Sequence, residues 1–210
     1  REEAARYVVP VPLLGMLVSG SAALQVLPTN PVLTGVLKTL ASGEAVLCAA
    51  LHESGQVDGV TAVQRDGQWQ LTGQADRVPL ADHPGACWIL AQTEKGMGAF
   101  LFDLQAVGIQ RQRQTLTSGE YVFALQLDAV AASELALDGD AVTLVQRAEL
   151  FGMAATAAMA VGVCAEMTRM AAAYGSERKQ FGKPIASFQA VAHLLADCYI
   201  ETEALRGVTQ

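Results

Sequence analysis

The feature that most constrains the fold is a change of sequence periodicity that occurs twice along the chain. Between residues 42 and 142, short runs rich in β-branched and aromatic residues are separated by turn residues. On either side of this zone, apolar residues recur at the three- to four-residue spacing of helices. Such a chain buries its strands in one sheet-based domain flanked by helices. We therefore predict an α+β fold, with an antiparallel middle β domain between helical segments.

Three domains follow from this pattern. Residues 1–41 are expected to be the end of a helical domain, with apolar runs at 13–17 and 32–40 broken by Pro10, Pro12, Pro28 and Pro31. The predicted strands of the β domain are residues 45–51, 59–65, 68–74, 86–92, 97–103 and 121–127. Asp66-Gly67 predicts a tight hairpin between two of them, because Asp-Gly readily adopts the positive φ angles of such turns.

From residue 143 to the end the sequence predicts two helices, one at about 144–174 and a second from about residue 187. The apolar stretch from Leu150 to Cys164 is shorter than the roughly 20 residues of a membrane span, so we interpret it as a buried helix. Two helices cannot shield such an alanine-rich face alone. The segment therefore predicts the first part of a four-helix bundle, completed by further chain or by a dimer partner.

Composition excludes one class of partner. The chain has 210 residues, 51% of them hydrophobic, and a formal net charge of -7, which argues for a globular core and against nucleic-acid binding. Its four cysteines, Cys48, Cys87, Cys164 and Cys198, lie in apolar stretches without metal-ligand spacing. We expect reduced, buried thiols and no metal site. The sequence does not open with basic residues followed by an apolar run, as a signal peptide would. Together with the expected reduced thiols, this favours a cytoplasmic protein.

One ordered run carries most of the chemistry, YGSERKQFGKPIASFQAVAHLLAD at residues 174–197. Arg178 stands where a helix gives way to a glycine-containing loop, and a guanidinium there can bind a pyrophosphate through two hydrogen bonds. Gln180 can add a hydrogen bond, and Phe181 offers a flat apolar surface to a ring. The alternative is that Arg178 pairs with Glu177 or Glu201 and that Phe181 belongs to the core.

This run resembles the signature of the acyl-CoA dehydrogenase family of FAD-dependent flavoproteins, and weaker similarity extends over nearly the whole chain. The resemblance implies the acyl-CoA dehydrogenase fold, FAD as cofactor, and a chain truncated at both ends. It places cofactor contacts at Arg178, Gln180, Phe181, Ile185 and Gln189 of the run, and at Leu51, His52, Val78 and Pro79 of the β domain. Family members often have a threonine where this chain has His52, and a Trp-x-Thr pair at Arg77-Val78-Pro79. Flavin contacts in the β domain would then be mostly backbone and apolar.

The resemblance also implies α,β-dehydrogenation of an acyl-CoA thioester, in which a carboxylate removes the Cα proton while a hydride leaves Cβ for the flavin. The base in most members is a later glutamate, beyond Gln210. In a minority it lies near the start of the long helix, at the position of Gly152, which cannot act as a base. Glu149 lies nearly one turn earlier, where a solvated carboxylate is the simpler interpretation. No catalytic residue is assigned.

Further expectations follow from the same resemblance. They are an acyl-CoA substrate from fatty acid or lipid metabolism, an electron-transfer acceptor, and a homodimer or homotetramer. Two alternatives stay open. One is a non-catalytic family member within a hetero-oligomer, and the other is a flavin oxidase or monooxygenase on the same fold. His52 could also serve as a base, although a histidine on a strand is more often structural.

Overall fold

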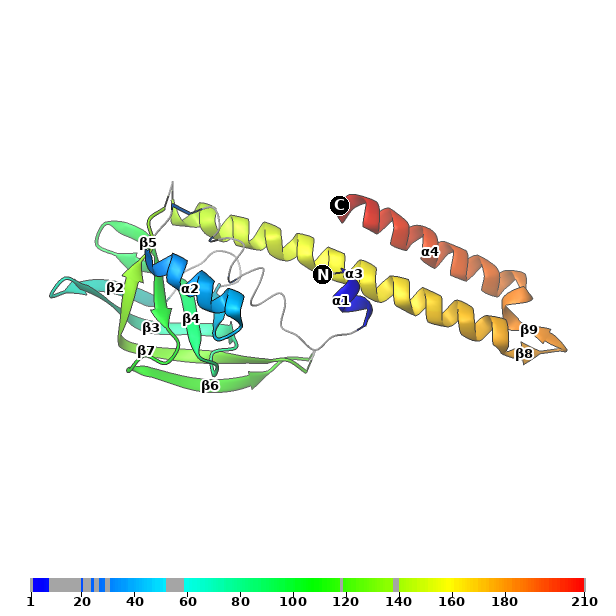
Figure 1. Cartoon of the computed structure of the whole chain (residues 1–210), viewed down its shortest axis with the longest axis horizontal. Coiled ribbons are helices and arrows are strands. Elements are labelled where there is room, and N and C mark those ends of the chain that lie inside the picture. Colours follow the sequence, from blue (N-terminus) through cyan, green and yellow to red (C-terminus); the bar gives the residue numbers. More distant parts are fainter. Residues whose placement is uncertain are drawn as a thin grey trace. The chain divides into compact units, whose positions relative to one another are not determined.

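The computed structural model describes residues 2–7, 20, 24, 27–28, 31–51, 59–117, 119–137 and 140–209. The chain divides into two compact units (Figure 1), one at Pro12–Gly152 and one formed by Arg1–Val11 with Met153–Gln210. The three domains predicted from the sequence remain a proposal beside this division. The predicted proline-broken run at 13–17 and His52 lie outside the described residues.

The first unit holds a seven-stranded mixed sheet. Its strands are β1 (Val46–Ala50), β2 (Val60–Arg65), β3 (Gln68–Pro79), β4 (Gly85–Thr93), β5 (Gly96–Asp103), β6 (Ile109–Thr115) and β7 (Tyr121–Glu134). The order is β1-β4-β2-β3-β7-β5, and β5 also pairs with β4, so five strands form a ring. The ring closes between β2 and β4 through one described bridge, Thr61 to Gln92. The predicted fold class, a sheet between helical segments, is confirmed.

Strand β4 is buried along most of its length because its two faces meet two different cores. Cys87 and Ile89 face a cluster formed by the sheet strands, which includes Leu71, Phe100 and Leu127. Trp88 and Leu90, with the opposite alternation, face a second cluster. That second cluster includes Leu33 of helix α2 (Pro31–Ser42) and Leu144 of helix α3 (Ala141–Glu177). The predicted helix at 32–40 is thereby confirmed, and it packs against β1 and β4.

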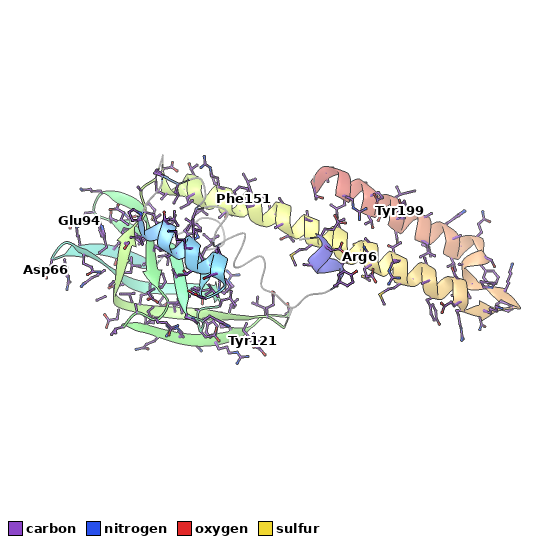
Figure 2. All side chains as sticks on the ribbon, in the orientation of Figure 1. Arg6, Asp66, Glu94, Tyr121, Phe151 and Tyr199 are labelled. Carbon is purple, nitrogen blue, oxygen red and sulfur yellow. The ribbon has the colours of Figure 1, made fainter. Side chains whose placement is uncertain are left out.

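The predicted hairpin of the sheet matches the sequence closely. Asp66 and Gly67 adopt φ angles of 49° and 80°, and Arg65 pairs with Gln68, so the predicted two-residue turn joins β2 and β3. Figure 2 labels Asp66 at this turn and Glu94 at the turn between β4 and β5. The antiparallel prediction is wrong at β4, with which both β1 and β2 pair in parallel. A residue pattern fixes which face of a strand is buried, but it leaves the direction of the neighbouring strand open.

The second unit consists of helix α1 (Glu2–Arg6), α3 from Met153 onward, the short strands β8 (Lys179–Gln180) and β9 (Lys183–Pro184), the 3₁₀ turn η4 (Ile185–Ser187), and helix α4 (Gln189–Thr209). Helix α4 runs back along α3 (Figure 1). The two predicted C-terminal helices are confirmed, and the loop between them is a small hairpin.

Helix α1 is joined to both long helices by ion pairs. Arg6, labelled in Figure 2, donates from Nε to Glu166 of α3 over 3.2 Å. Arg206 of α4 donates to Glu2 over 2.8 Å and also pairs with Glu203. At Gly162 the helices are so close that an added Cβ would lie 2.1 Å from the carbonyl oxygen of Glu2. Glycine is therefore required at this helix contact.

Burial along α3 differs from the sequence-based expectation. Leu150 and Met153 are 61% and 62% exposed, and only 17% of the most apolar window of α3 is buried in the described chain. By length and composition α3 could cross a membrane, a test that the core helix of a bundle also passes. The prediction of a buried helix is wrong for this chain alone, because α1 and α4 cover too little of α3. Cys164 and Cys198 are exposed for the same reason, whereas Cys48 and Cys87 are buried as predicted.

Candidate functional site

The hairpin between α3 and α4 has a specific and strained turn. Lys179 pairs with Pro184 and Gln180 with Lys183, which leaves Phe181 and Gly182 as a two-residue loop. Their φ angles are 51° and 77°, so both central residues are in the left-handed region, as in a type I′ turn. Glycine accepts this conformation freely, whereas a bulky aromatic residue rarely adopts it. A strained residue of this kind is a reason to look for a function.

The strained turn exposes its aromatic ring. Phe181 is 93% exposed, and its only described ring neighbour is Phe188, whose centroid lies 6.2 Å away in an edge-to-face arrangement. The Lys183 ammonium lies 4.6 Å from the centroid of Phe188 and adds a cation–π contact beneath the turn. Phe181 is therefore not a core residue of the described chain. It presents an apolar surface that another aromatic group can cover.

Arg178 is fixed by its backbone, while its side chain extends from the turn. Its amide donates to the Tyr174 carbonyl over 2.8 Å, and its carbonyl accepts from the Ile185 amide over 2.8 Å. These two bonds connect the last turn of α3 to η4. The guanidinium forms no ion pair with any described residue, so the pairing with Glu177 or Glu201 considered above is not formed.

The remaining predicted residues of this group lie on the same short stretch of chain. Gln180 is exposed, and its amide donates to the Lys179 carbonyl over 2.9 Å. Ile185 is half-buried at the start of η4, and Gln189 opens α4, with its amide nitrogen 3.5 Å from Nε2 of His193. The hairpin thus brings together amide groups, an exposed aromatic ring and a cation that has no ion-pair partner among the described residues. These are the groups that hold a phosphate next to a ring system.

The predicted β-domain contacts lie in the other unit and differ in character. Val78 is fully buried and pairs with Phe123, while Pro79 pairs with Val122 and is half-buried. Leu51 follows β1 and is half-buried against the second core cluster. Since Val78 points into the core, a ligand could reach this position only through its backbone. This agrees with the apolar, backbone-dominated contacts expected from the absence of threonines.

The backbone is irregular where β3 ends. The pairing of β3 with β7 shifts between Ala75 and Val78. Arg77 and Leu80, on either side of Val78 and Pro79, have φ angles of 52° and 58°. Bulges and left-handed residues often redirect a strand beside a functional site. The periodicity of the sequence gives no signal for this irregularity, so sequence reasoning did not anticipate it.

Acid–base and metal chemistry are sparsely represented in the described part of the chain. Gly152 and the exposed Glu149 both lie on α3, and neither carries evidence of a catalytic role. His83 is exposed and lies 2.7 Å from the Asp82 carboxylate, as part of a surface turn. Among the described residues, no three histidine, cysteine, aspartate or glutamate side chains are grouped to hold a metal ion. The described residues of the candidate site thus offer groups that can bind a ligand.

The chain is an α+β protein in which a mixed sheet lies between helical segments and is followed by a helical hairpin with this turn. Residues 143–210 match the family described as "Acyl-CoA dehydrogenase, C-terminal domain". The chain belongs to the acyl-CoA dehydrogenase family.

Similar proteins agree on this family. FadE28, an acyl-CoA dehydrogenase of Mycobacterium tuberculosis, is 28% identical over 203 residues, which is 97% of this chain and 58% of the relative. A solved structure described as the Tcur3481–Tcur3483 steroid ACAD is 35% identical, with a TM-score of 0.81 over 99% of this chain and 57% of that one. Butyryl-CoA dehydrogenase from Megasphaera elsdenii, 21% identical with a TM-score of 0.86 over 99% and 59%, shares the fold. The chain spans about half the length of the relatives it matches.

Proposed function

We propose that this chain forms the flavin-holding part of an FAD-dependent acyl-CoA dehydrogenase, which oxidises an acyl-CoA thioester between Cα and Cβ. The observation that carries the proposal is the strained hairpin, which exposes Phe181 three residues after Arg178, whose guanidinium has no ion pair within the described part of the chain. Family membership supports it, because the hairpin lies inside the matched segment. Bound FAD would supply the hydride-accepting chemistry of such a reaction.

The described residues fit a flavin dinucleotide in two ways. Arg178 can donate two parallel hydrogen bonds to a pyrophosphate, and Gln180 can add a neutral one. Phe181 can cover one face of a ring, and the loss of water from both surfaces favours that contact. In the β domain, Leu51 and Pro79 offer apolar surface and carbonyl oxygens, while the neighbouring Val78 side chain is occupied in the core. Ile185 and Gln189 would shape the edge of the hairpin.

The test is FAD binding by the protein and by two matched variants. We expect Arg178→Ala to weaken FAD binding about 30-fold, equivalent to about 2 kcal/mol for one charge-assisted contact. Lys179→Ala is the control, because it removes an adjacent exposed cation from the same hairpin and should change the Kd little. Quenching of flavin fluorescence measures the FAD dissociation constant of each variant. Equal losses for the two variants would show that only net charge matters and would overturn the assignment of Arg178.

A second candidate function has a specific observation in its favour. Gly152 stands at the position where a minority of the family would carry its base, so this chain could serve as a non-catalytic subunit. Two similar structures, the Tcur3481–Tcur3483 protein and the ChsE4–ChsE5 complex from Mycobacterium tuberculosis, are each named for two components. A hetero-oligomer in which a partner chain supplies the base is consistent with both. The flavin oxidase or monooxygenase alternative has no observation of its own here.

Activity measurements separate these candidates. FAD-loaded protein would be mixed with a panel of acyl-CoA thioesters, straight-chain and steroid side-chain, and flavin bleaching would be followed without oxygen. Bleaching by this chain alone supports the dehydrogenase. FAD binding without bleaching, restored when a co-expressed family member is added, supports the subunit. Turnover that requires oxygen and yields hydrogen peroxide supports the oxidase.

A further inference from the structure

Two cysteines of the β domain are direct neighbours in the sheet. Cys48 of β1 is the register partner of Cys87 of β4 in a parallel pair. Both are 0% exposed and belong to the same core cluster, so both side chains lie on one face of the sheet. Adjacent strands are about 4.8 Å apart, and disulfides need a Cα separation of about 4.4–6.8 Å. The backbone therefore already provides the spacing of a disulfide.

The two thiols also interact with each other. Cys48 Sγ points to the Ala86 carbonyl at 3.8 Å, and Cys87 Sγ points to the Trp88 carbonyl at 3.5 Å. Burial, followed by contact with the Cys48 thiol, raises the pKa of Cys87 well above its ordinary value. The Cys87 thiol is therefore protonated at neutral pH, and reaction with oxidants is slow unless β1 opens or the pH rises.

We propose that Cys48 and Cys87 are a redox pair that closes to an intrachain disulfide on two-electron oxidation and joins β1 to β4. The oxidant is hydrogen peroxide. One sulfur is first oxidised to a sulfenic acid and one water leaves; the second thiol then attacks this sulfur and the second water leaves. Two thiols and one peroxide thus yield one disulfide and two waters. This inference goes beyond the proposed function and does not depend on it.

The position of β1 provides a route for the oxidant. Within the described part of the sheet, β1 pairs with β4 alone, so its separation breaks one set of strand hydrogen bonds. Strands at an edge open at lower free energy than strands paired on both sides. Once closed, the disulfide would hold β1 against β4. Leu51, which follows β1 directly, would be held with it.

The experiment uses the full chain with the two exposed cysteines replaced, Cys164→Ser and Cys198→Ser, because they would otherwise consume peroxide and cross-link chains. The folded protein is treated with hydrogen peroxide, then alkylated with N-ethylmaleimide in denaturant. We expect the mass to fall by two hydrogen atoms, both thiols to resist alkylation together, and proteolysis to release one peptide pair joined at Cys48 and Cys87. Dithiothreitol should reverse all three changes. The rate should increase with pH.

Matched variants Cys48→Ala and Cys87→Ala, in the same background, leave one thiol that cannot close a bond within the chain. Each should instead accumulate oxygen adducts. If either variant does not fold, the peptide map of the unaltered pair still decides. The proposal is overturned if both thiols remain alkylatable under peroxide treatment that fully oxidises Cys164 and Cys198 in the parent protein. It is equally overturned if the linked peptides form only after the protein has been unfolded in urea.

Discussion

At the scale of single residues, Phe181 shows a conflict between local conformation and side-chain type. A left-handed backbone costs a non-glycine residue about 1–2 kcal/mol, and Phe181 gains little packing in return because its ring is 93% exposed. Asparagine or aspartate followed by glycine would form the same turn more easily. Phe181 therefore makes the hairpin less stable and leaves its ring exposed. Such a combination is expected of a residue that binds a ligand and not of a structural residue.

Phe181→Asn tests this conflict directly. We expect the substitution to stabilise the protein by about 1 kcal/mol, since asparagine tolerates the left-handed region, and to weaken FAD binding because the ring is lost. Urea unfolding gives the first effect and fluorescence titration the second. Phe181→Leu is the control: it keeps the strain and the apolar character without the ring. If asparagine leaves FAD affinity unchanged, Phe181 does not contact the cofactor.

At the scale of elements, the sequence predicted those strands and helices whose residue pattern is local. The strand β6 was missed because Ile109 is its only strongly apolar residue. The glutamines and arginines that follow are exposed, apart from the half-buried Gln114. The parallel pairing of β1 was missed because strand direction depends on distant chain. In the candidate site, the motif identified Arg178 and Phe181, whereas the strain at Phe181 and at Arg77 appears only in the backbone angles. The predicted burial of α3 assumed partners that the described chain does not supply.

Two glycines of α3 provide a matched test of helix packing. We expect Gly162→Ala to destabilise the protein by about 1–3 kcal/mol, because the new methyl group would meet the Glu2 carbonyl and displace α1. Gly152→Ala has open space around its Cβ position and should stabilise α3 by up to about 1 kcal/mol. Urea unfolding monitored by circular dichroism measures both. Similar effects at the two positions would mean that α1 does not pack at Gly162.

The ion pairs of α1 predict a specific dependence on pH. Hydrogen bonds from Arg169 and then Arg6 lower the pKa of Glu166 from 4.5 to about 2. A lowered folded-state pKa stabilises the protein above the unfolded value, and this stabilisation is lost as the pH falls through the folded value. We expect Glu166→Gln to be less stable than the parent protein above about pH 5, with the difference shrinking as the pH falls and vanishing below about pH 2. A difference that is constant over this range would show that the Glu166 charge is not responsible.

At the scale of the whole molecule, the predicted cofactor contacts are divided between two compact units. Arg178, Gln180 and Phe181 lie in one, while Leu51 and Pro79 lie in the other. If one FAD molecule binds both groups, the two groups can belong to one chain or to two chains of an oligomer. In the second case, cofactor binding and assembly stabilise each other by the same free energy. We propose the second case.

Mixed oligomers distinguish these arrangements. One variant carries Arg178→Ala, and the other carries Pro79→Glu, which places a charge at a half-buried β-domain contact. We expect each variant alone to bind FAD at least 30-fold more weakly, from losses of about 2 kcal/mol or more, and their heterodimer to regain part of the binding. Recovery requires that the intact hairpin of one chain serves the intact β domain of the other. A confirmed heterodimer without recovery would show that the hairpin acts within its own chain.

The ring of strands in the first unit has a seam. Most neighbouring strands share several paired residues, but β2 and β4 meet at the single described bridge of Thr61 and Gln92. The unit is thus a barrel that is only weakly closed, because its two meeting strands, β2 and β4, share few hydrogen bonds. Thermal fluctuations should separate β2 from β4 before they separate β3 from β7. Amide hydrogens of β2 and β4 at the seam should therefore exchange with solvent first. The seam is accordingly the place where an engineered cross-link would tighten the domain most.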